Sequence, residues 1–376
     1  MNTPPSNQAE VTVKKVFVSI VLAGCGVSST PPDGIEPPQA PPHTRTSATS
    51  DRMPPGPLTG YRIEALPTPV PSGRSYASRA ICATGGVVGT SDITGFGESH
   101  AVRYAGGTLT DLGTLGGATS SAIDGNAAGT IVGNSAAPNN GAAFVYRNGV
   151  MSQLSGIGGQ FSSAYAINDR EEIVGQASIP GEGDVDEHAI LWEPDCSNAV
   201  DLTALNGGRY SWARDINNSG DIVGSDAILP DMIHSRAVAW RNRVLVELDD
   251  NGAPDSQATA INESGAITGF IQGLGGRRAV IWRNGTMVDL GSLGGQYSDA
   301  MGIDNAGDVV GDSTLPAGYR FSATLFTAGT VIDLNDYIDQ THWWLAQATD
   351  ICDDGRIVGN GELDGVTRGF ILTPEP

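Results

Sequence analysis

A nine-residue unit that recurs along the chain constrains the fold more than any other feature. Each clear copy begins with Ile, has Gly at its fifth position and ends with Gly; these copies span residues 216–224, 261–269, 303–311 and 351–359. Less regular copies span residues 81–89, 123–133 and 167–175. Self-similarity at a fixed period is typical of repeat architectures. The sequence therefore specifies an architecture more clearly than an activity.

The spacing and content of the units favour β-propeller blades. The leading isoleucines lie at positions 81, 123, 167, 216, 261, 303 and 351, so successive units are about 42 to 49 residues apart. Each unit holds four strand-like pieces, of which the third has a small residue three positions before an aromatic one. With 17% charged residues and 51 Gly, the composition suits short strands and tight turns better than helices.

A four-residue turn lies inside the repeated unit, with Asn or Asp first in most copies and Gly near the end. Asn and Asp side chains bond to the backbone of their own turn, and Gly accepts positive φ. We interpret these residues as turn formers rather than ligands. Two copies depart from the pattern: Glu171 replaces the usual Gly, and the copy at 123–133 carries two extra residues.

The count of strand-like pieces predicts how the ring closes. The seventh unit ends at Leu372 without a fourth piece, whereas residues 61–66 precede the first unit and have the register of a fourth piece. An N-terminal strand that completes the last blade closes a propeller and removes open sheet edges. We therefore predict an all-β fold, a seven-bladed β-propeller with three-plus-one closure.

The N-terminal segment has the layout of an export signal. Lys14 and Lys15 precede an apolar run over residues 16–23, which is too short to span a bilayer as a helix. Residues 22–25, Leu-Ala-Gly-Cys, resemble the lipobox of bacterial lipoproteins. That resemblance implies cleavage before Cys25 and lipidation of its sulfur. The alternatives are an ordinary signal peptide that contains Cys, or a misassigned start.

We divide the chain into a lipoprotein signal peptide at 1–24, a Pro-rich linker at 25–58 and a propeller of seven repeats at 59–373. The Pro pairs of the linker favour extended polyproline II, and the segment is too polar to bury a core, so we expect a disordered spacer. The expected location is outside the cytoplasm, with a lipid anchor in the bacterial cell envelope, at the outer membrane or cell surface.

The strand and turn motifs resemble those of the HAF-repeat family of bacterial extracellular proteins, named for a His-Ala-Phe strand. The Ile-Asn-x-x-Gly turn, the Val-Val-Gly strand, the Asp-Leu-Gly strand and third pieces such as residues 188–192 (His-Ala-Ile-Leu-Trp) carry the resemblance. It covers residues 61–373. Membership implies an exported repeat protein of unassigned activity and supplies no catalytic residues.

Charge and cysteine content exclude several function classes. The formal net charge of -21 argues against binding to nucleic acid, which needs clustered Lys and Arg. The densest acidic loop, residues 182–187, lacks the spaced oxygen ligands of an EF-hand, so we expect no metal and no other cofactor. Cys82 and Cys352 occupy the same repeat position and could pair where the ring closes, whereas Cys196 is expected to be unpaired.

No catalytic motif stands out. The sequence has no nucleophile elbow, phosphate loop or metalloprotease helix. His100 and His188 share one repeat position with Arg in other units, and Asp recurs once per blade at positions 111, 201, 289 and 333. Recurrence favours structural roles for all of them. We therefore predict a protein without enzymatic activity.

What remains is binding through loops of unequal length. The longest insertions span residues 178–187, 194–198, 227–235 and 336–347, and we expect them to share one face. The last contains Trp343 and Trp344, which suit stacking on sugars or on apolar partner surfaces, with core packing as the alternative. Trp212 and Tyr210 are further candidates.

These observations lead to two hypotheses. The first is a monomeric, non-catalytic, lipid-anchored propeller that binds a protein or polysaccharide and touches the membrane only through its anchor. The alternative is a carbohydrate-active enzyme, a glycoside hydrolase or lyase, on the same scaffold. The second hypothesis needs carboxylates that belong to single blades, and every Asp found so far recurs in most of them.

Overall fold

The computed structural model describes residues 60–375, apart from residues 71, 82–85, 95–96, 139–140, 181–185, 195–198, 203–208, 228–233, 274, 317–319 and 340–341. The predicted signal peptide, Cys25 and the linker lie outside the described residues, as do Cys82 and Cys196. Within the described part of the chain, no helix has the length and apolar content needed to cross a membrane.

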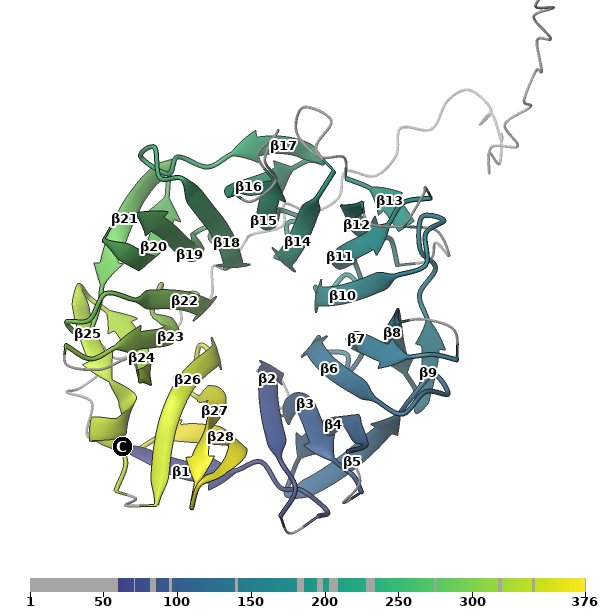
Figure 1. Cartoon of the computed structure of the whole chain (residues 1–376), viewed down its shortest axis with the longest axis horizontal. Helices are drawn as coiled ribbons and strands as arrows, with labels where there is room; N and C mark the ends of the chain where they lie inside the picture. Colours follow the sequence, from purple (N-terminus) through teal and green to yellow (C-terminus); the bar gives the residue numbers. More distant parts are fainter. Residues whose placement is uncertain are drawn as a thin grey trace, which may run out of the picture. The chain divides into compact units, whose positions relative to one another are not determined.

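Seven four-stranded antiparallel sheets surround a central axis as the blades of a β-propeller (Figure 1). The first three blades comprise β2 (Ser75–Ile81), β3 (Gly86–Asp92), β4 (Ser99–Ala105) and β5 (Thr108–Gly113); β6 (Ser120–Gly125), β7 (Ile131–Ala136), β8 (Gly141–Arg147) and β9 (Val150–Gln153); and β10 (Ser162–Ile167), β11 (Ile173–Ser178), β12 (Glu187–Trp192) and β13 (Ala199–Asp201). The next three comprise β14 (Ser211–Ile216), β15 (Ile222–Ala227), β16 (Ser235–Arg241) and β17 (Val244–Glu247); β18 (Asp255–Ile261), β19 (Ile267–Gly273), β20 (Gly276–Arg283) and β21 (Thr286–Gly291); and β22 (Ser298–Ile303), β23 (Val309–Thr314), β24 (Phe321–Thr327) and β25 (Thr330–Asp333).

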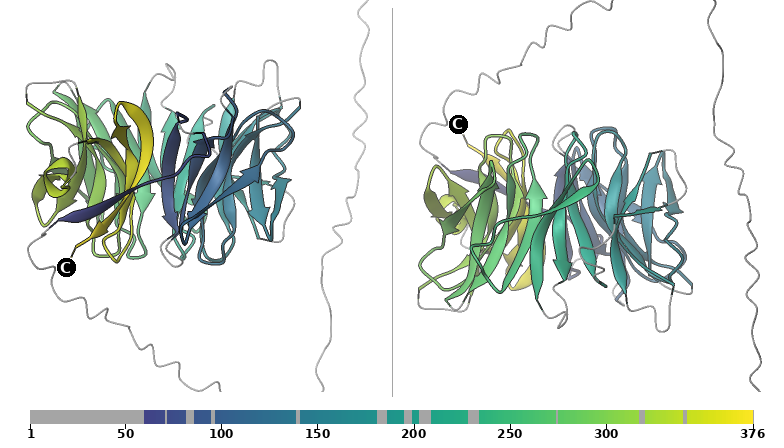
Figure 2. Two further views of the ribbon diagram at one scale, coloured as in Figure 1. Left: turned by 90° about the horizontal axis from the view of Figure 1, so that it is seen from below. Right: turned by 90° about the horizontal axis from the view of Figure 1, so that it is seen from above.

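The seventh blade joins the two ends of the folded part. It consists of β26 (Trp343–Ile351), β27 (Ile357–Leu363), β28 (Val366–Pro374) and, as its outer strand, β1 (Tyr61–Ala65). β1 pairs with β28 from Tyr61↔Pro374 to Ala65↔Phe370, and Figure 2 shows it beside the yellow C-terminal strands. A short 3-10 helix, η2 (Leu334–Tyr337), precedes this blade. The predicted seven-bladed propeller with three-plus-one closure is confirmed.

Aromatic residues of the third strands fill the space between blades. Trp192, Trp240 and Trp282 are buried. The indole N–H of Trp240 donates to the Leu202 carbonyl at 3.1 Å, and that of Trp282 donates to the Asp249 carbonyl at 2.6 Å. Each acceptor belongs to the preceding blade or its connection. The rings therefore bury their apolar surface between blades while their polar groups stay paired.

The closing Gly of the nine-residue unit is required by a bulge in the innermost strand. In β14 the register with β15 shifts between Ala213 and Asp215. A Cβ atom at Gly224 would lie 1.8 Å from the carbonyl oxygen of Trp212, which is far inside any real contact. Only Gly permits this approach of two backbones, which explains why the position is Gly in every blade.

The two faces of the ring are built differently (Figure 2). The nine-residue hairpins join first to second strands, and tight turns such as Asn148-Gly149, both with positive φ, join third to fourth strands. Antiparallel order places both connections on one face, here called the hairpin face. The other connections lie on the opposite face, the loop face. The connections β11–β12, β15–β16 and β25–β26 belong to the loop face and β12–β13 belongs to the hairpin face, so the insertions predicted in these four connections do not share one face. Residues 181–185, 195–198, 228–233 and 340–341 of these insertions lie outside the described residues.

The copy at 123–133 has no insertion. Asp124 pairs with Val132 and Gly125 with Ile131, so Gly125 takes the place of the leading Ile and the unit spans nine residues, 125–133. The sequence alignment was wrong by two positions because it used Ile123 as its marker. We call the strand residue that pairs with the one before the closing Gly the axial position. Its occupants in chain order are Arg79, Asp124, Ala166, Asp215, Ala260, Gly302 and Asp350.

Candidate functional site

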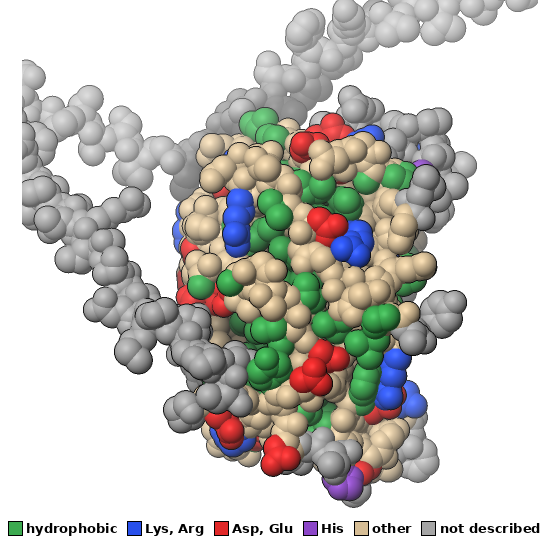
Figure 3. Space-filling model, turned by 90° about the vertical axis from the view of Figure 1, so that its left-hand side faces the viewer, with side chains coloured by type: hydrophobic (Ala, Val, Ile, Leu, Met, Phe, Trp, Pro, Cys, Tyr) green, Lys and Arg blue, Asp and Glu red, His purple; other side chains and the backbone are tan. Residues whose placement is uncertain are grey.

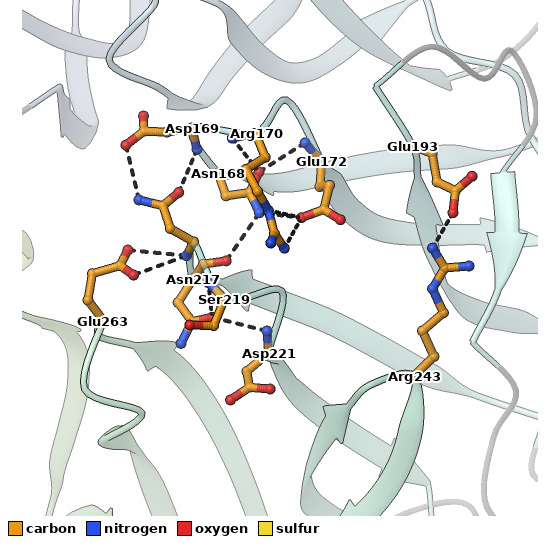
Figure 4. Close-up of polar contacts among 11 residues, drawn as sticks. Asn168, Asp169, Arg170, Glu172, Glu193, Asn217, Ser219, Asp221, Arg243 and Glu263 are labelled. Atoms are coloured by element: carbon orange, nitrogen blue, oxygen red, sulfur yellow. Dashed lines mark hydrogen bonds and ion pairs between the residues drawn. The ribbon is translucent and has the colours of Figure 1, made fainter. Parts of the chain in front are cut away.

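On the hairpin face, the repeated Asn residues join neighbouring blades (Figure 4). The side-chain oxygen of Asn217 accepts from the amides of Ser219 and Asp221 in its own turn, at 3.0 Å each. Its side-chain nitrogen donates to the Asn262 carbonyl of the next blade at 3.2 Å. The same donor bond runs from Asn126 to Asn168, from Asn168 to Asn217 and from Asn262 to Asp304. The interpretation as turn formers was incomplete, because this Asn ladder also ties the blades together.

The ladder changes chemistry in the last two blades. Asp304 accepts from the Asp308 amide at 2.8 Å as an Asn would, but a carboxylate has no N–H with which to continue the ladder. Cys352 holds the ladder position of the seventh blade and is disulfide-bonded. Cys82, the partner that the sequence analysis left open, lies outside the described residues. Hydrogen bonds donated by Asn side chains therefore join most neighbouring blades, and a covalent disulfide bond is present at this position in the closing blade.

The repeated His and Asp residues pair with each other at the blade edges. His100 Nδ1 lies 2.9 Å from an Asp111 carboxylate oxygen, and His188 Nδ1 lies 2.8 Å from Asp201. Where the unit has Arg, the pair becomes an ion pair such as Arg278 with Asp289 at 3.3 Å. These contacts link the third and fourth strands of a single blade. Their recurrence supports the structural roles assigned from the sequence.

The axial position breaks the sevenfold pattern. The Arg79 guanidinium, with 18% of its side chain exposed, lies between carboxylates of three other blades: 3.4 Å from Asp124, 3.2 Å from Asp215 and 3.6 Å from Asp350. Asp124 and Asp215 also accept the amide hydrogens of Ile167 and Ile261 in the following blades, each at 2.9 Å. This axial cluster lines a pocket of about 230 Å³ at the hairpin-face end of the axis.

Burial and charge oppose each other in the axial cluster. Burial alone would lower the pKa of Arg79, but the charges of Asp215, Asp124 and Asp350 outweigh it and raise that pKa further above its usual range. Burial raises the pKa of Asp124 to about 7, while Arg79 works in the opposite direction. We regard Asp124 as ionised, since it faces a guanidinium and accepts two backbone N–H groups. The cluster is a cross-axis contact among four blades.

The loop face carries a larger cavity between the first three blades, here called the loop-face groove. Its volume is about 710 Å³, and eleven of its eighteen lining residues are Ser, Thr, Asn or Gln. Two aromatic side chains, Tyr76 and Phe161, border it with 38% and 49% of their surface exposed. Glu187 is the single charged residue among the described residues that line it. A wide polar cavity with aromatic edges suits a ligand rich in hydroxyl groups.

Bonds between blades hold the polar groups of the groove in place. Thr90 Oγ1 lies 2.6 Å from Ser121 Oγ across the first blade junction. The side-chain oxygen of Asn134 accepts from the Ala164 amide of the next blade at 3.1 Å. Gln176 Nε2 donates to Glu187 at 2.7 Å, while Gln176 Oε1 is buried without a partner among the described residues. The groove is therefore preorganised and keeps one acceptor unfilled.

The aromatic residues predicted from the sequence separate into two places. Tyr210 and Trp212 stack with ring centroids 6.2 Å apart, and a bridge pairs Tyr210 with Glu187, which places the pair beside the groove. Trp344 is half-buried, donates to the Phe321 carbonyl at 3.0 Å and carries Arg320 over its ring. Trp343 packs edge-on against Phe370 in the core of the closing blade, which matches the core-packing alternative.

Two carboxylates that belong to a single blade face each other near the loop face. Asp299 and Asp312 are cross-strand partners on β22 and β23, with 9% and 4% exposed surface. Asp299 lies 3.2 Å from Arg277, whereas Asp312 accepts from the Gln347 amide at 2.7 Å. Burial raises the pKa of both groups, and that of Asp312 reaches about 7. The sequence analysis missed this pair because it examined only the recurring Asp.

Other surfaces offer less. Asp186, from the acidic loop in which no metal site is expected, pairs with Arg209 at 2.5 Å, and no group of His, Cys, Asp or Glu in the described part of the chain is placed to hold a metal ion. On the outer wall over β21 and β25, hydrophobic side chains are interspersed with charged and uncharged polar ones (Figure 3). The loop-face groove is therefore the best-formed candidate site.

Comparison with known proteins supports the β-propeller fold but assigns the chain to no family. No protein-family model matches the chain, and no curated protein matches it. The resemblance to the HAF-repeat family thus stays a prediction.

Solved propeller structures do match. An oligogalacturonate lyase from Vibrio parahaemolyticus superposes with a TM-score of 0.55 at 10% identity, over 84% of this chain and 97% of the lyase. A puromycin-hydrolyzing peptidase from Mycobacterium tuberculosis gives 0.51 at 12% identity, over 82% of this chain. TolB from Acinetobacter baumannii gives 0.44 at 11% identity, over 85% of this chain. The chain spans 51% of the peptidase and 65% of TolB. At these identities the likeness concerns the β-propeller fold alone.

Proposed function

We propose that this protein is a non-catalytic, lipid-anchored β-propeller of the cell envelope that binds a polysaccharide in the loop-face groove. The observation that carries the proposal is the groove itself, with its volume of about 710 Å³, its lining of hydroxyl and amide side chains and its bordering rings of Tyr76 and Phe161. Sugars present hydroxyl groups at their edges and C–H groups on their faces, which suits such a lining.

A polysaccharide fits this cavity better than a folded protein does. Protein interfaces bury a core of aromatic and large apolar side chains. The groove lining instead contains small polar residues, and its apolar members apart from Tyr76 and Phe161 are Ala and Gly. A narrow chain can enter such a concave site, whereas a flat protein surface cannot. We therefore favour the polysaccharide among the two partner classes expected from the sequence.

The proposed envelope location rests on two observations. Residues 22–25 resemble a lipobox, and Cys352 is disulfide-bonded. Disulfides persist mainly in oxidising compartments outside the cytoplasm. Mass spectrometry of the mature N-terminus from membrane fractions should find Cys25 with a lipid on its sulfur. An unmodified Cys25, or cleavage at another residue, would contradict the anchor without affecting the groove.

Binding is tested with two matched substitutions. Phe161 borders the groove and precedes Ser162, while Tyr297 precedes the equivalent Ser298 in the sixth blade and does not line the groove. Both rings are exposed, so we expect each Ala variant to change the free energy of unfolding by less than about 0.5 kcal/mol. Phe161→Ala should weaken oligosaccharide binding about tenfold, roughly 1.4 kcal/mol, and Tyr297→Ala should not. Equal losses in both variants, or no binding of any oligosaccharide by the wild type, would contradict the proposal.

A carbohydrate-active enzyme is a second candidate, favoured by Asp299 and Asp312. One carboxylate is held by Arg277, and the other, with a pKa of about 7, can carry a proton at neutral pH. Two carboxyl groups in different environments are the usual basis of acid–base work on glycosidic bonds. This candidate expects oligosaccharide cleavage that Asp312→Asn abolishes and Asp289→Asn, a repeat-wide position, retains. Absence of product with every substrate tested would exclude it.

A further inference from the structure

We infer that the ligand of the loop-face groove is an uncharged saccharide and that the groove excludes uronic-acid chains. This inference rests on the proposed function, because it specifies the chemical class of the polysaccharide bound at the same site. It follows from the charges at the groove, from one unfilled acceptor and from the two bordering rings.

The first observation is the charge of the lining. A carboxylate on a sugar is recognised by Arg or Lys, most strongly by a bidentate guanidinium. No Arg or Lys is among the described residues that line the groove, and Glu187 contributes a negative charge to it. Near Glu187, Arg209 pairs with Asp186 and Arg214 lies over the Tyr165 ring. A uronate would therefore meet Glu187 and no cationic side chain among the described lining residues.

The net negative charge of the whole molecule also disfavours binding of anionic saccharides. The formal net charge of -21 places a negative potential around the propeller, which lowers the local concentration of polyanions. This repulsion is screened over about 10 Å at 0.1 M salt. The contribution of the net charge should thus fade with salt, whereas that of Glu187, inside the groove, should persist.

The second observation is the pairing of Gln176 with Glu187. Because a carboxylate only accepts, the Gln176 side chain must present Nε2 to Glu187, as the 2.7 Å bond shows, and this fixes Oε1 as the free end. That oxygen is buried and without a partner among the described residues. A buried acceptor without a donor costs about 1 to 3 kcal/mol. A donor that reaches this oxygen would remove that cost; a sugar hydroxyl is such a donor, whereas an ionised carboxylate is not.

The third observation is the placement of the rings. Tyr76 and Phe161 border a cavity whose other described lining residues are mostly small, and their exposed surface is available to a ligand. Sugar rings without a charged substituent can lie with their C–H faces against aromatic rings while their hydroxyls reach Ser, Thr and Asn side chains. The groove therefore combines apolar contact for sugar faces with acceptors for sugar hydroxyls, and its described lining residues include no cationic side chain for an anion.

The test compares saccharides of equal length by isothermal titration calorimetry. Glucose and mannose hexamers serve as uncharged probes, and galacturonate and glucuronate hexamers serve as anionic probes, each at low and at high salt. We expect at least one uncharged hexamer to bind about tenfold or more tightly than either uronate at both salt concentrations, with a larger ratio at low salt. Glu187→Gln should reduce that ratio several-fold. Glu362→Gln, which alters an exposed loop-face carboxylate outside the groove, should leave it unchanged.

The outcomes separate this inference from the proposed function. Uronate binding as tight as that of the uncharged hexamers, or tighter, overturns the inference and leaves polysaccharide binding in place. An unchanged ratio in Glu187→Gln also overturns it, because the discrimination would then arise elsewhere. Absence of binding by every hexamer overturns the proposed function and the inference with it. Circular dichroism and thermal unfolding of both variants establish that the fold is retained.

Discussion

The hairpin face and the loop face of this propeller are made from the same seven repeats, yet they differ in what their polar side chains do. On the hairpin face, Asn126, Asn168, Asn217 and Asn262 repeat one bond to the next blade. On the loop face, the Ser at the start of the first strands also recurs: Ser120, Ser162 and Ser211 each accept from a third-strand amide of the preceding blade. Other polar positions, such as those of Asn134 and Gln176, vary from blade to blade and line a groove between three of them. Regular polar residues here serve the ring, and irregular ones are available to a ligand.

The axial cluster complicates this comparison in a useful way. It lies at the hairpin-face end, yet its residues differ among blades as those of the loop face do. Its contacts are nevertheless internal, since Arg79 is surrounded by carboxylates of its own chain. Irregularity alone therefore does not mark a ligand site, and substitutions are needed to separate structural from binding roles.

Substitution of Arg79 should have the largest effect on the free energy of unfolding. Arg79→Met leaves three carboxylates around the axis without their cation, so we expect the free energy of unfolding to fall by about 3 to 5 kcal/mol. Chemical denaturation measures it, with Arg278→Met as the control, because the Arg278–Asp289 pair is exposed and should contribute less than about 1 kcal/mol. Arg79→Lys should recover part of the loss. Equal effects of Arg79→Met and Arg278→Met would remove the structural role of the axial cluster.

The second effect concerns the closing blade. Cys352→Ser removes the disulfide at the ladder position of the seventh blade, and we expect a loss of about 2 to 4 kcal/mol. Thermal unfolding of the variant, and of the wild type with and without reductant, measures this. Peptide mapping without reduction should recover Cys352 joined to Cys82. A linkage to Cys196, or equal stability of oxidised and reduced protein, would show that the bond does not close the ring.

The buried Asp312 near the loop face should make the stability of the fold depend on pH. The folded pKa of Asp312 is about 7, above its ordinary 3.8, so between these values the folded chain binds more protons than the unfolded chain. Its contribution to stability is therefore fully present below about pH 4 and is lost as the pH rises to 7. Asp312→Asn should flatten this decline by about 1.4 kcal/mol for each unit of pKa shift. Urea unfolding from pH 4 to 8 tests it, and parallel curves would contradict the shift.

Removal of one hydrogen bond of the Asn ladder should have the smallest effect on stability. Asn217→Asp keeps the oxygen that accepts from Ser219 and Asp221 and removes the donor to Asn262, as Asp304 does naturally. We expect a loss of about 1 kcal/mol. Asn148→Asp makes the same change of charge in an exposed turn of the hairpin face and serves as the control. Losses of equal size would mean that charge, rather than the bond to the next blade, matters.

The sequence predicted the fold well because strand count and turn chemistry are local. Seven units, a missing last strand and a spare first strand lead directly to the pairing of Tyr61 with Pro374. The closing Gly was recognised as part of the repeat, although its cause, a backbone oxygen 1.8 Å from where a Cβ would lie at Gly224, is visible only in three dimensions.

The site was harder to predict because its contacts join distant blades. Arg79 meets Asp215 across 136 positions of sequence, and nothing local to either residue marks the pair. Asp124 was hidden further by the Gly that replaces the leading Ile after it. Tyr210 and Trp212 were named as further aromatic candidates, but most of the polar lining beside them consists of Ser and Thr, which carry no signal on their own.

The axial cluster has a consequence for the number of blades. Bonds between neighbours, such as those of the Asn ladder, would be satisfied equally well in a ring of six or eight units. Arg79 instead makes contacts across the ring axis, because its guanidinium reaches carboxylates of the second, fourth and seventh blades at once. Gain or loss of a repeat by duplication or deletion would change the distances across the ring and leave a buried charge without its partners. This one side chain therefore ties the copy number of the repeat to the stability of the ring.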